Sequence, residues 1–201
     1  MRIHSGRLKG RRLPVPPGSR PIGGRLKVSL FSVLAPYLPE ARVLDLCAGA
    51  GGMGLEALSR GAAEVVLVDK DPRICQGLRA WLREADPEGG GTVRRGDVLT
   101  GTLPEGPFDM ILLDPPYPLW EPESTLRMLG RAVARLAPEG LLVCKVPAKM
   151  DLPEDPRWRL IRRTAVASAA YALLTPTGDE GREPESRHGD QAEGRGGRID
   201  K

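Results

Sequence analysis

The four residues Asp114-Pro115-Pro116-Tyr117 are the part of this sequence best suited to chemistry. They end a predicted buried strand over residues 108–114, and open α/β sheets bind ligands at the carboxyl ends of their strands. The two prolines stiffen the turn, and Pro115 offers a carbonyl but no N–H. The Asp114 carboxylate and the Pro115 carbonyl suit the two N–H donors of an exocyclic amino group. Tyr117 adds a flat face for stacking, so the segment predicts a site for an amino group on a base.

A glycine-rich turn follows the first predicted strand and leads into a predicted helix. Gly49, Gly51 and Gly54 satisfy the pattern G-x-G-x-x-G, in which glycines let a ligand approach the backbone closely. Asp69 ends the next predicted strand, 20 residues after Gly49, where an acid can accept hydrogen bonds from ribose hydroxyls. The arrangement predicts a site for a cofactor that carries adenosine.

Two further aspartates narrow the choice of cofactor. Asp45 precedes the glycines at the end of the first strand, where a carboxylate would pair with an ammonium group. This favours S-adenosylmethionine over a dinucleotide. Asp97 follows the third predicted strand and is placed to accept from an adenine amino group, with a turn aspartate as the alternative. The cofactor-binding residues are expected to be Asp45, Ala48, Gly49, Gly51, Asp69, Lys70, Asp97 and Val98, with no metal.

The elements that must position these residues alternate between strands and helices. The predicted strands cover residues 42–46, 64–69, 92–95, 108–114, 141–146, 158–165 and 168–174. The predicted helices cover residues 25–35, 53–60, 72–84 and 125–136, the last ended by Pro138 and Gly140. Near-continuous apolar strands such as 64–69 are typical of a parallel sheet buried on both faces. The pattern predicts a Rossmann-like α/β fold with a doubly wound, mostly parallel, seven-stranded sheet.

Charge is distributed unevenly along the chain. Residues 1–39 contain eight Lys or Arg and no Asp or Glu, whereas the remaining 162 residues carry 22 bases and 26 acids. Such asymmetry indicates a polyanionic partner. The expected RNA-binding residues are Arg2, Arg7, Lys9, Arg11, Arg12, Arg20 and Arg25.

Composition also divides the chain into three parts. We expect a basic arm over residues 1–22, with a hairpin around Gly6 or Gly10 and without a core of its own. We expect the α/β domain over 23–174 and a disordered tail over 175–201, which is rich in charge and poor in apolar side chains.

Several classes of protein are excluded by what the sequence contains. No apolar run approaches the roughly 18–20 residues of a membrane span. The basic N-terminus continues into Gly, Pro and Arg, unlike a secretory signal. Cys47, Cys75 and Cys144 are too few and too scattered for a disulfide framework or a zinc site. We therefore expect small core cysteines in a reducing cytoplasm.

With these motifs the chain resembles class I S-adenosylmethionine-dependent methyltransferases of the [DN]-P-P-[YFW] group, which modify amino nitrogens. Within that group it is similar to the bacterial small-subunit ribosomal RNA guanine-N2 methyltransferase family, over about residues 1–175. The resemblance is carried by Arg2-Ile3, Gly10-Arg11-Arg12-Leu13, Arg20-Pro21, Leu30-Phe31, Val43-Leu44-Asp45-Leu46, the run from Gly54 to Ala62, and Leu113 to Tyr117.

The resemblance implies methyl transfer from S-adenosylmethionine to the N2 amino group of a guanine in 16S ribosomal RNA. The partner would be this RNA or an assembling small subunit, and S-adenosylhomocysteine the product. Asp114, Pro115, Pro116 and Tyr117 would be the catalytic residues. We expect a cytoplasmic monomer without membrane contact.

One segment departs from the family pattern. Ile22-Gly23-Gly24-Arg25-Leu26-Lys27-Val28 stands where the family usually has Thr-Thr-Asp-Arg-Val-Arg-Glu. The polar and acidic positions are lost while Arg25 remains, which puts into question any role of this segment in positioning cofactor or base.

Three alternative functions use the same residues differently. An adenine-N6 methyltransferase of DNA or RNA could use the same Asp114–Tyr117 chemistry, although the chain has no obvious separate sequence-reading domain. A nicotinamide-dependent oxidoreductase would explain the glycines but neither Asp114–Tyr117 nor the basic arm. A non-enzymatic RNA-binding protein would explain the arm alone.

Overall fold

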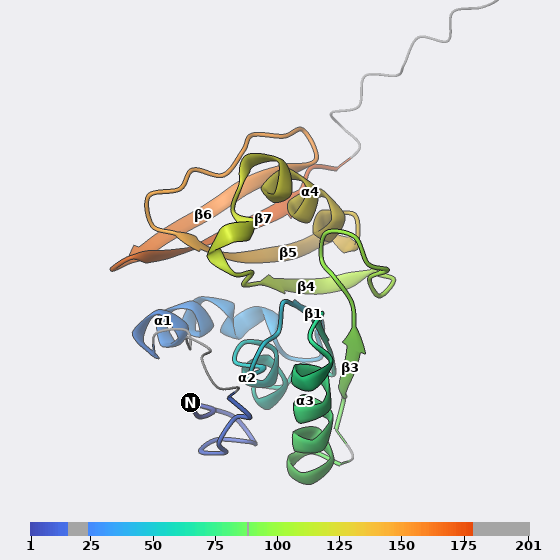
Figure 1. The fold of residues 1–201 in the computed structure, drawn as a ribbon. Helices are drawn as coiled ribbons and strands as arrows, with labels where there is room; N and C mark the ends of the chain where they lie inside the picture. Colours follow the sequence, from blue (N-terminus) through green and yellow to red (C-terminus); the bar gives the residue numbers. More distant parts are fainter. Residues whose placement is uncertain (16–23, 88, 179–201) are drawn as a thin grey trace, which may run out of the picture.

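The sheet at the centre of the computed structural model has seven strands in the order β3-β2-β1-β4-β5-β7-β6 (Figure 1). The structure describes residues 1–15, 24–87 and 89–178. Strands β1 to β5 pair in parallel, whereas β7 is antiparallel to both β5 and β6. The strands are β1 Arg42–Leu46, β2 Glu64–Asp69, β3 Gly91–Arg95, β4 Phe108–Leu113, β5 Leu136–Pro147, β6 Trp158–Val166 and β7 Ala169–Pro176. The predicted mostly parallel, seven-stranded sheet is thus confirmed.

Helices cover both faces of this sheet (Figure 1). The helices are α1 Gly24–Leu34, α2 Gly54–Ser59, α3 Pro72–Ala85 and α4 Pro122–Val133, with 3₁₀ turns η1 Ala35–Tyr37 and η2 Tyr117–Leu119. Successive strand residues point to opposite faces, so neighbouring apolar residues enter different cores. Val65 joins the core under α1, α2 and α3, while Val66 joins the core under α4.

The boundary between α4 and β5 differs from the prediction of a helix over 125–136 and a strand over 141–146. Helix α4 begins at Pro122, because proline suits the first turn of a helix, and it ends at Val133. Strand β5 begins at Leu136, which pairs with Phe108. Pro138 and Gly140 therefore lie inside β5. The pairing of β4 with β5 shifts register between Phe108 and Met110, and this irregularity accommodates both residues. Proline and glycine are disfavoured in a regular strand but tolerated at such irregularities.

The C-terminal strand extends further than expected. Strand β7 includes Thr175, whose buried side chain donates a hydrogen bond to the Gly140 carbonyl at 3.2 Å. The prediction of a disordered tail from residue 175 is therefore wrong for its first two residues, because Thr175 and Pro176 are part of the sheet. The rest of the predicted tail, residues 179–201, lies outside the described residues.

The first 15 residues form the predicted hairpin and pack against the domain. The Ile3 N–H donates to the Arg11 carbonyl at 3.1 Å, and the Gly10 N–H donates to the Ile3 carbonyl at 2.9 Å. Ile3, Leu8 and Leu13 are buried in the core that α1, α2 and α3 share. The hairpin therefore uses the core of the α/β domain in place of one of its own.

Glu56 of α2 connects the hairpin to the domain. Its fully buried carboxylate accepts from the backbone N–H groups of His4 at 2.9 Å and Ser5 at 3.1 Å. It also pairs with Lys27 and Arg60, each at 2.9 Å. Burial alone would raise the pKa of Glu56, but the donors from His4, Lys27 and Arg60 hold this pKa below its ordinary value. Lys27, from the segment that departs from the family pattern, thus has a structural role.

Candidate active site

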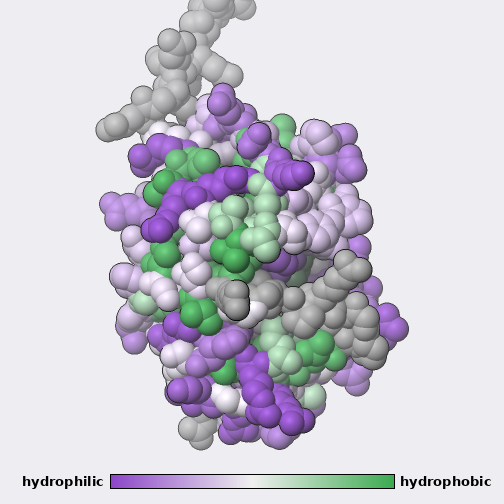
Figure 2. Space-filling view, turned by 90° about the vertical axis from the view of Figure 1, so that its left-hand side faces the viewer, coloured by the Kyte–Doolittle hydropathy of each residue, from purple (hydrophilic) through white to green (hydrophobic). Residues whose placement is uncertain are grey.

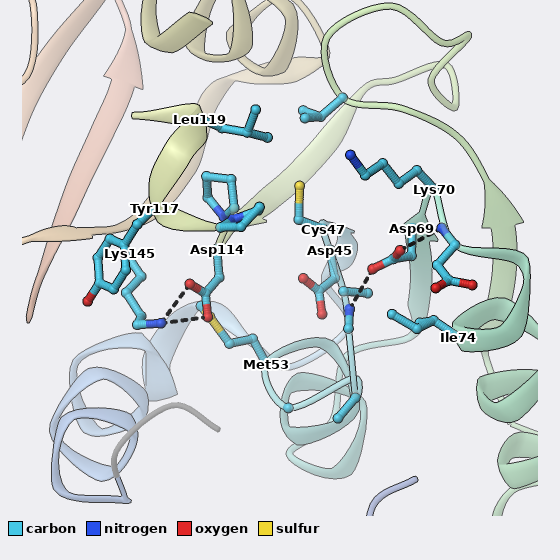
Figure 3. A pocket seen from close by; sticks show the side chains of 18 of the residues that line it. Asp45, Cys47, Met53, Asp69, Lys70, Ile74, Asp114, Tyr117, Leu119 and Lys145 are labelled. Carbon is cyan, nitrogen blue, oxygen red and sulfur yellow. Dashed lines mark hydrogen bonds and ion pairs between the residues drawn. The ribbon is translucent and has the colours of Figure 1, made fainter. Parts of the chain in front are cut away.

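A cavity of about 550 Å³ lies at the carboxyl ends of the central strands (Figure 3). Parallel pairing aligns Leu46 at the end of β1 with Val68 of β2 and Leu113 of β4, so the residues that follow these strands meet at one edge. All but one of the predicted cofactor-binding and catalytic residues line the cavity. They are Asp45, Ala48, Gly49, Asp69, Lys70, Asp97, Val98, Asp114, Pro115, Pro116 and Tyr117.

Gly51 is the predicted residue that does not line the cavity. Its φ is +73°, and a Cβ there would lie 2.6 Å from the Leu55 side chain and 2.9 Å from that of Leu78. Its N–H donates to the Ala48 carbonyl at 2.8 Å. Gly51 therefore shapes the turn from inside, because only glycine has both the conformation and the space, and it does not line the cavity.

Asp45 is a buried carboxylate between the two ends of the cavity (Figure 3). Its Oδ2 accepts from the Gly54 N–H at 2.7 Å. A Cβ on Gly54 would lie 2.7 Å from the same oxygen, so this close approach requires glycine. Burial, together with the charges of Asp114 and Asp69, raises the pKa of Asp45 to about 8. A cation beside this carboxylate would favour its charged form.

Asp69 and Asp97 are both engaged by nearby backbone. Asp69 accepts from the N–H groups of Gly49 and Asp71, each at 2.9 Å, which ties the end of β2 to the glycine turn. Asp97 accepts from the Leu99 N–H at 2.7 Å and therefore stabilises its own turn, the alternative that the sequence left open. Carboxylate oxygens accept more than one hydrogen bond, so both remain able to accept from a ligand.

The carboxylate of Asp114 is paired with a residue that the sequence did not single out. Lys145 of β5 reaches it with Nζ 2.7 Å from Oδ1 and 3.0 Å from Oδ2 (Figure 3). Burial raises the pKa of Asp114 above its ordinary value, while the charge and hydrogen bonds of Lys145 act in the opposite direction. A lysine within the apolar stretch 141–146 was the available signal, because charged residues are rare in buried strands.

The remaining members of the predicted catalytic segment shape an open part of the cavity. Tyr117 is 52% exposed and begins η2, so its ring is accessible to a planar ligand. Leu119 and Trp120 continue the same wall. A carboxylate with a cationic partner thus lies beside an accessible aromatic ring, the arrangement expected for holding a base with a polar edge.

The N-terminal hairpin also contributes to this cavity, which the sequence analysis missed. Met1 and Val15 line it. A Cβ on Gly52 would lie 2.9 Å from the Met1 side-chain methyl carbon, so glycine lets the hairpin approach the glycine turn. The hairpin was expected to bind only RNA, but it also forms part of the cavity wall.

The predicted RNA-binding residues differ in how firmly the protein holds them. Arg7 forms an ion pair with Asp86, with Nη2 2.8 Å from Oδ2. Arg2 donates to the Gly10 carbonyl at 2.7 Å. Lys9, Arg11 and Arg12 are exposed on the hairpin. Arg20 and the side chain of Arg25 lie outside the described residues.

The three cysteines are not all core residues. Cys75 and Cys144 are buried as predicted, but Cys47 is partly exposed and lines the cavity. A φ of +63° at Cys47, directly after β1, turns this residue out of the strand direction. Burial and the neighbouring aspartates raise the pKa of its thiol, which makes it a poor nucleophile.

The described residues contain neither a membrane-spanning helix nor a metal-binding cluster. None of their helices is long and apolar enough to cross a membrane. They also contain no cluster of three or more His, Cys, Asp or Glu side chains arranged to hold a metal ion.

Comparison with known proteins places the chain among relatives of similar length. The family described as conserved hypothetical protein 95 matches residues 1–175. Ribosomal RNA small subunit methyltransferase D of Escherichia coli K12 is 35% identical over 177 residues, covering 86% of this chain and 88% of the relative. The Haemophilus influenzae protein of the same name is 30% identical over 179 residues, covering 86% and 92%.

Solved structures agree with this relationship. A hypothetical protein of Thermus thermophilus has a TM-score of 0.69 and 30% identity, covering 86% of this chain and 98% of that one. Magnesium protoporphyrin IX methyltransferase of Synechocystis, solved with bound S-adenosylhomocysteine, has a TM-score of 0.62 over 80% of this chain and 90% of that one. At 12% identity, the second similarity establishes the fold alone.

Proposed function

The chain belongs to the family of the small-subunit ribosomal RNA methyltransferases D, and on this premise we propose that it methylates the exocyclic N2 amino group of a guanine in 16S ribosomal RNA, with S-adenosylmethionine as the methyl donor. The observation that carries the proposal is the arrangement of Asp45 and Asp114 in one cavity, with the exposed Tyr117 beside Asp114. A buried carboxylate for a cation and an acceptor-rich edge for an amino group are the two requirements of this reaction.

The residues of the cavity fit S-adenosylmethionine. Asp45 is a buried carboxylate whose charged form needs a cationic partner, and the cofactor has an ammonium group. A volume of about 550 Å³ lies within the range of small-molecule sites. Asp69 would accept from the ribose hydroxyls, and Asp97 and Val98 would lie against the adenine. The same Asp45 disfavours a dinucleotide, because it would face an anionic pyrophosphate.

The chemistry of the step divides between the bound cofactor and the protein. When bound, S-adenosylmethionine supplies a methyl group whose bond to sulfur breaks, its electron pair staying on sulfur, as the amino nitrogen's lone pair forms the new N–C bond. Asp114 and the Pro115 carbonyl hold the amino hydrogens and aim the nitrogen lone pair. Asp114 also stabilises the positive charge that develops on nitrogen. The methylated nitrogen then loses its surplus proton to solvent water, so no strong base is required before attack.

Binding of RNA would involve both the cavity and the surface. A base inside a helix cannot reach the methyl group, so it must leave its stack, and Tyr117 would stack on it. Lys9, Arg11 and Arg12 would hold phosphates and supply affinity without reading sequence. Figure 2 shows hydrophilic side chains spread over the face on the left of Figure 1, interrupted by small apolar patches. Such a surface suits a polar, hydrated partner. We expect the protein to act as a cytoplasmic monomer.

The test is transfer of an isotope-labelled methyl group to 16S ribosomal RNA and to small subunits, followed by nuclease digestion and mass analysis of the nucleosides. We expect N2-methylguanosine. Asp114→Ala should lower kcat by about 10²–10³-fold, since it removes a group that stabilises transition-state charge. Asp151→Ala, at an exposed acid, is the matched control and should leave the rate unchanged.

Two results would count against the proposal. Undiminished transfer by Asp114→Ala would remove the assigned role of this residue. A product of N6-methyladenosine would assign the chain to the alternative amino methyltransferase. Calorimetric titration with S-adenosylhomocysteine and with NAD distinguishes either methyltransferase from an oxidoreductase, which would bind NAD tightly.

A further inference from the structure

We propose that Lys145 contacts the target base directly, donating a hydrogen bond to the ring nitrogen next to the amino group, which is N3 in guanine. Lys145 and Asp114 would together set the rotation of the base in its own plane. This inference rests on the proposed function and assigns a specificity-determining residue to the same site.

The position of Lys145 is set by the sheet. Leu113 of β4 aligns with Cys144 of β5, so Asp114 and Lys145 follow as neighbours at the carboxyl edge. The Lys145 side chain is 19% exposed and lines the same cavity as Tyr117, so part of it faces the space where a stacked base would lie. Figure 3 shows the Lys145 and Tyr117 side chains at the same end of the cavity as Asp114.

The ion pair presents an acceptor and a donor side by side. When it is ionised, the Asp114 carboxylate accepts hydrogen bonds and donates none. The Lys145 ammonium donates through its three N–H groups and accepts none. Two contacts to Asp114 leave donor capacity on Nζ. A base edge that matches this pair must therefore carry an N–H donor next to an acceptor.

Directly next to its amino group, guanine carries one acceptor. Its amino group is flanked on one side by N3, an acceptor, and on the other by the N1–H donor. An ammonium group next to N1–H would place two donors together without an acceptor. With N3 toward Lys145, the amino group lies at Asp114 and Pro115. N1–H then lies on the side away from the Lys145 ammonium. Lys145 thus selects the orientation that brings the amino group to the acceptors.

The test replaces single atoms of the base. RNA is prepared with guanosine, 3-deazaguanosine or 7-deazaguanosine at the position methylated in the first experiment. We expect kcat/KM of the unsubstituted protein to fall about 10- to 100-fold with 3-deazaguanosine, the range for a hydrogen bond to a charged group. The 7-deaza substrate is the matched control and should react normally. An unchanged rate with 3-deazaguanosine overturns the inference without any variant.

Lys145→Met completes a double-mutant cycle. On guanosine this variant should lose at least as much activity as the 3-deaza substitution costs, because it also removes the two contacts to Asp114. Replacing guanosine by 3-deazaguanosine should then cost the variant little, because the contact to N3 is already gone. Losses that multiply would mean that Lys145 and N3 act independently, which overturns the proposed contact. Lys145→Arg should recover part of the activity on guanosine, since it keeps a charged donor. Calorimetry with S-adenosylhomocysteine checks that each variant keeps its cofactor site.

A pH profile separates direct contact from an effect on Asp114. If Lys145 served only to keep Asp114 ionised, raising the pH would restore Lys145→Met on guanosine. We expect the deficit to persist at high pH. Absence of any guanine methylation by the unsubstituted protein would be a failure of the proposed function, which is distinct from a normal rate with 3-deazaguanosine.

Discussion

Two carboxylates of the same cavity, Asp45 and Asp114, are held in different ways. Asp45 is fully buried and accepts from the backbone of Gly54, a contact made when the glycine turn folds. Asp114 is held by the flexible side chain of Lys145 and is partly exposed. A backbone donor cannot exchange its partner without unfolding the turn, whereas a lysine can. The difference suits a fixed cofactor end and an adaptable substrate end.

The largest test of this comparison is Asp45→Asn. Asn keeps an oxygen for the Gly54 N–H but loses the charge, so we expect S-adenosylhomocysteine to bind about 10- to 100-fold more weakly. The rate at saturating cofactor should change much less than in Asp114→Ala. Calorimetry and steady-state kinetics measure the two quantities. Loss of kcat with unchanged affinity would reverse the roles assigned to the two carboxylates.

The pH dependence of cofactor binding gives a second, smaller test. Burial raises the pKa of Asp45 to about 8, so below this pH the free carboxyl is mostly protonated and cannot pair with an ammonium. Affinity for S-adenosylhomocysteine should therefore rise as pH increases toward 8, by up to about tenfold per unit, and then level off. Binding near neutral pH should release a proton, measurable by calorimetry in buffers of different ionisation enthalpy.

A variant supplies the control for this pH profile. In Asp45→Asn the dependence between pH 6 and 8 should flatten, since the titrating group is gone. A rise that survives in the variant would assign the proton to another group and weaken the contrast between the two ends of the cavity.

The smallest expected effect concerns the hairpin. Neutralising Lys9, Arg11 and Arg12 together should weaken RNA binding roughly three- to tenfold and flatten its salt dependence, because each lost phosphate contact reduces the number of released counterions. Affinity for S-adenosylhomocysteine should stay nearly constant. Filter binding at several salt concentrations measures the first, and calorimetry the second.

Arg7→Gln is the matched comparison on the same hairpin. Its ion pair with Asp86 holds the hairpin against the end of α3, and Met1 and Val15 of this hairpin line the cavity. We therefore expect Arg7→Gln to lower cofactor affinity, unlike the exposed basic residues. If both variants lost affinity for S-adenosylhomocysteine to the same extent, the whole hairpin would be structural.

The sequence predicted the site best where short-range rules apply. A strand followed by glycines and an acid, or by Asp-Pro-Pro-Tyr, defines a local conformation, and parallel strands bring such ends together. The predictions were weaker where distant parts meet. The helix over 125–136 was misplaced because pairing of Leu136 with Phe108 overrides the expected stop at Pro138. Gly51 was expected to bind the cofactor but does not line the cavity, because the crowding by Leu55 and Leu78 around it depends on two neighbouring helices.

By itself, the sequence determined the class of fold, the carboxylates of the cavity and the separation of charge. These follow from periodicity, turn chemistry and composition, which act over a few residues. The tertiary structure alone decided that Lys145 pairs with Asp114, that Glu56 joins the hairpin to α1 and α2, and that Met1 reaches the cavity. These contacts join residues far apart in the chain, and their partners become identifiable only when the sheet sets their distances.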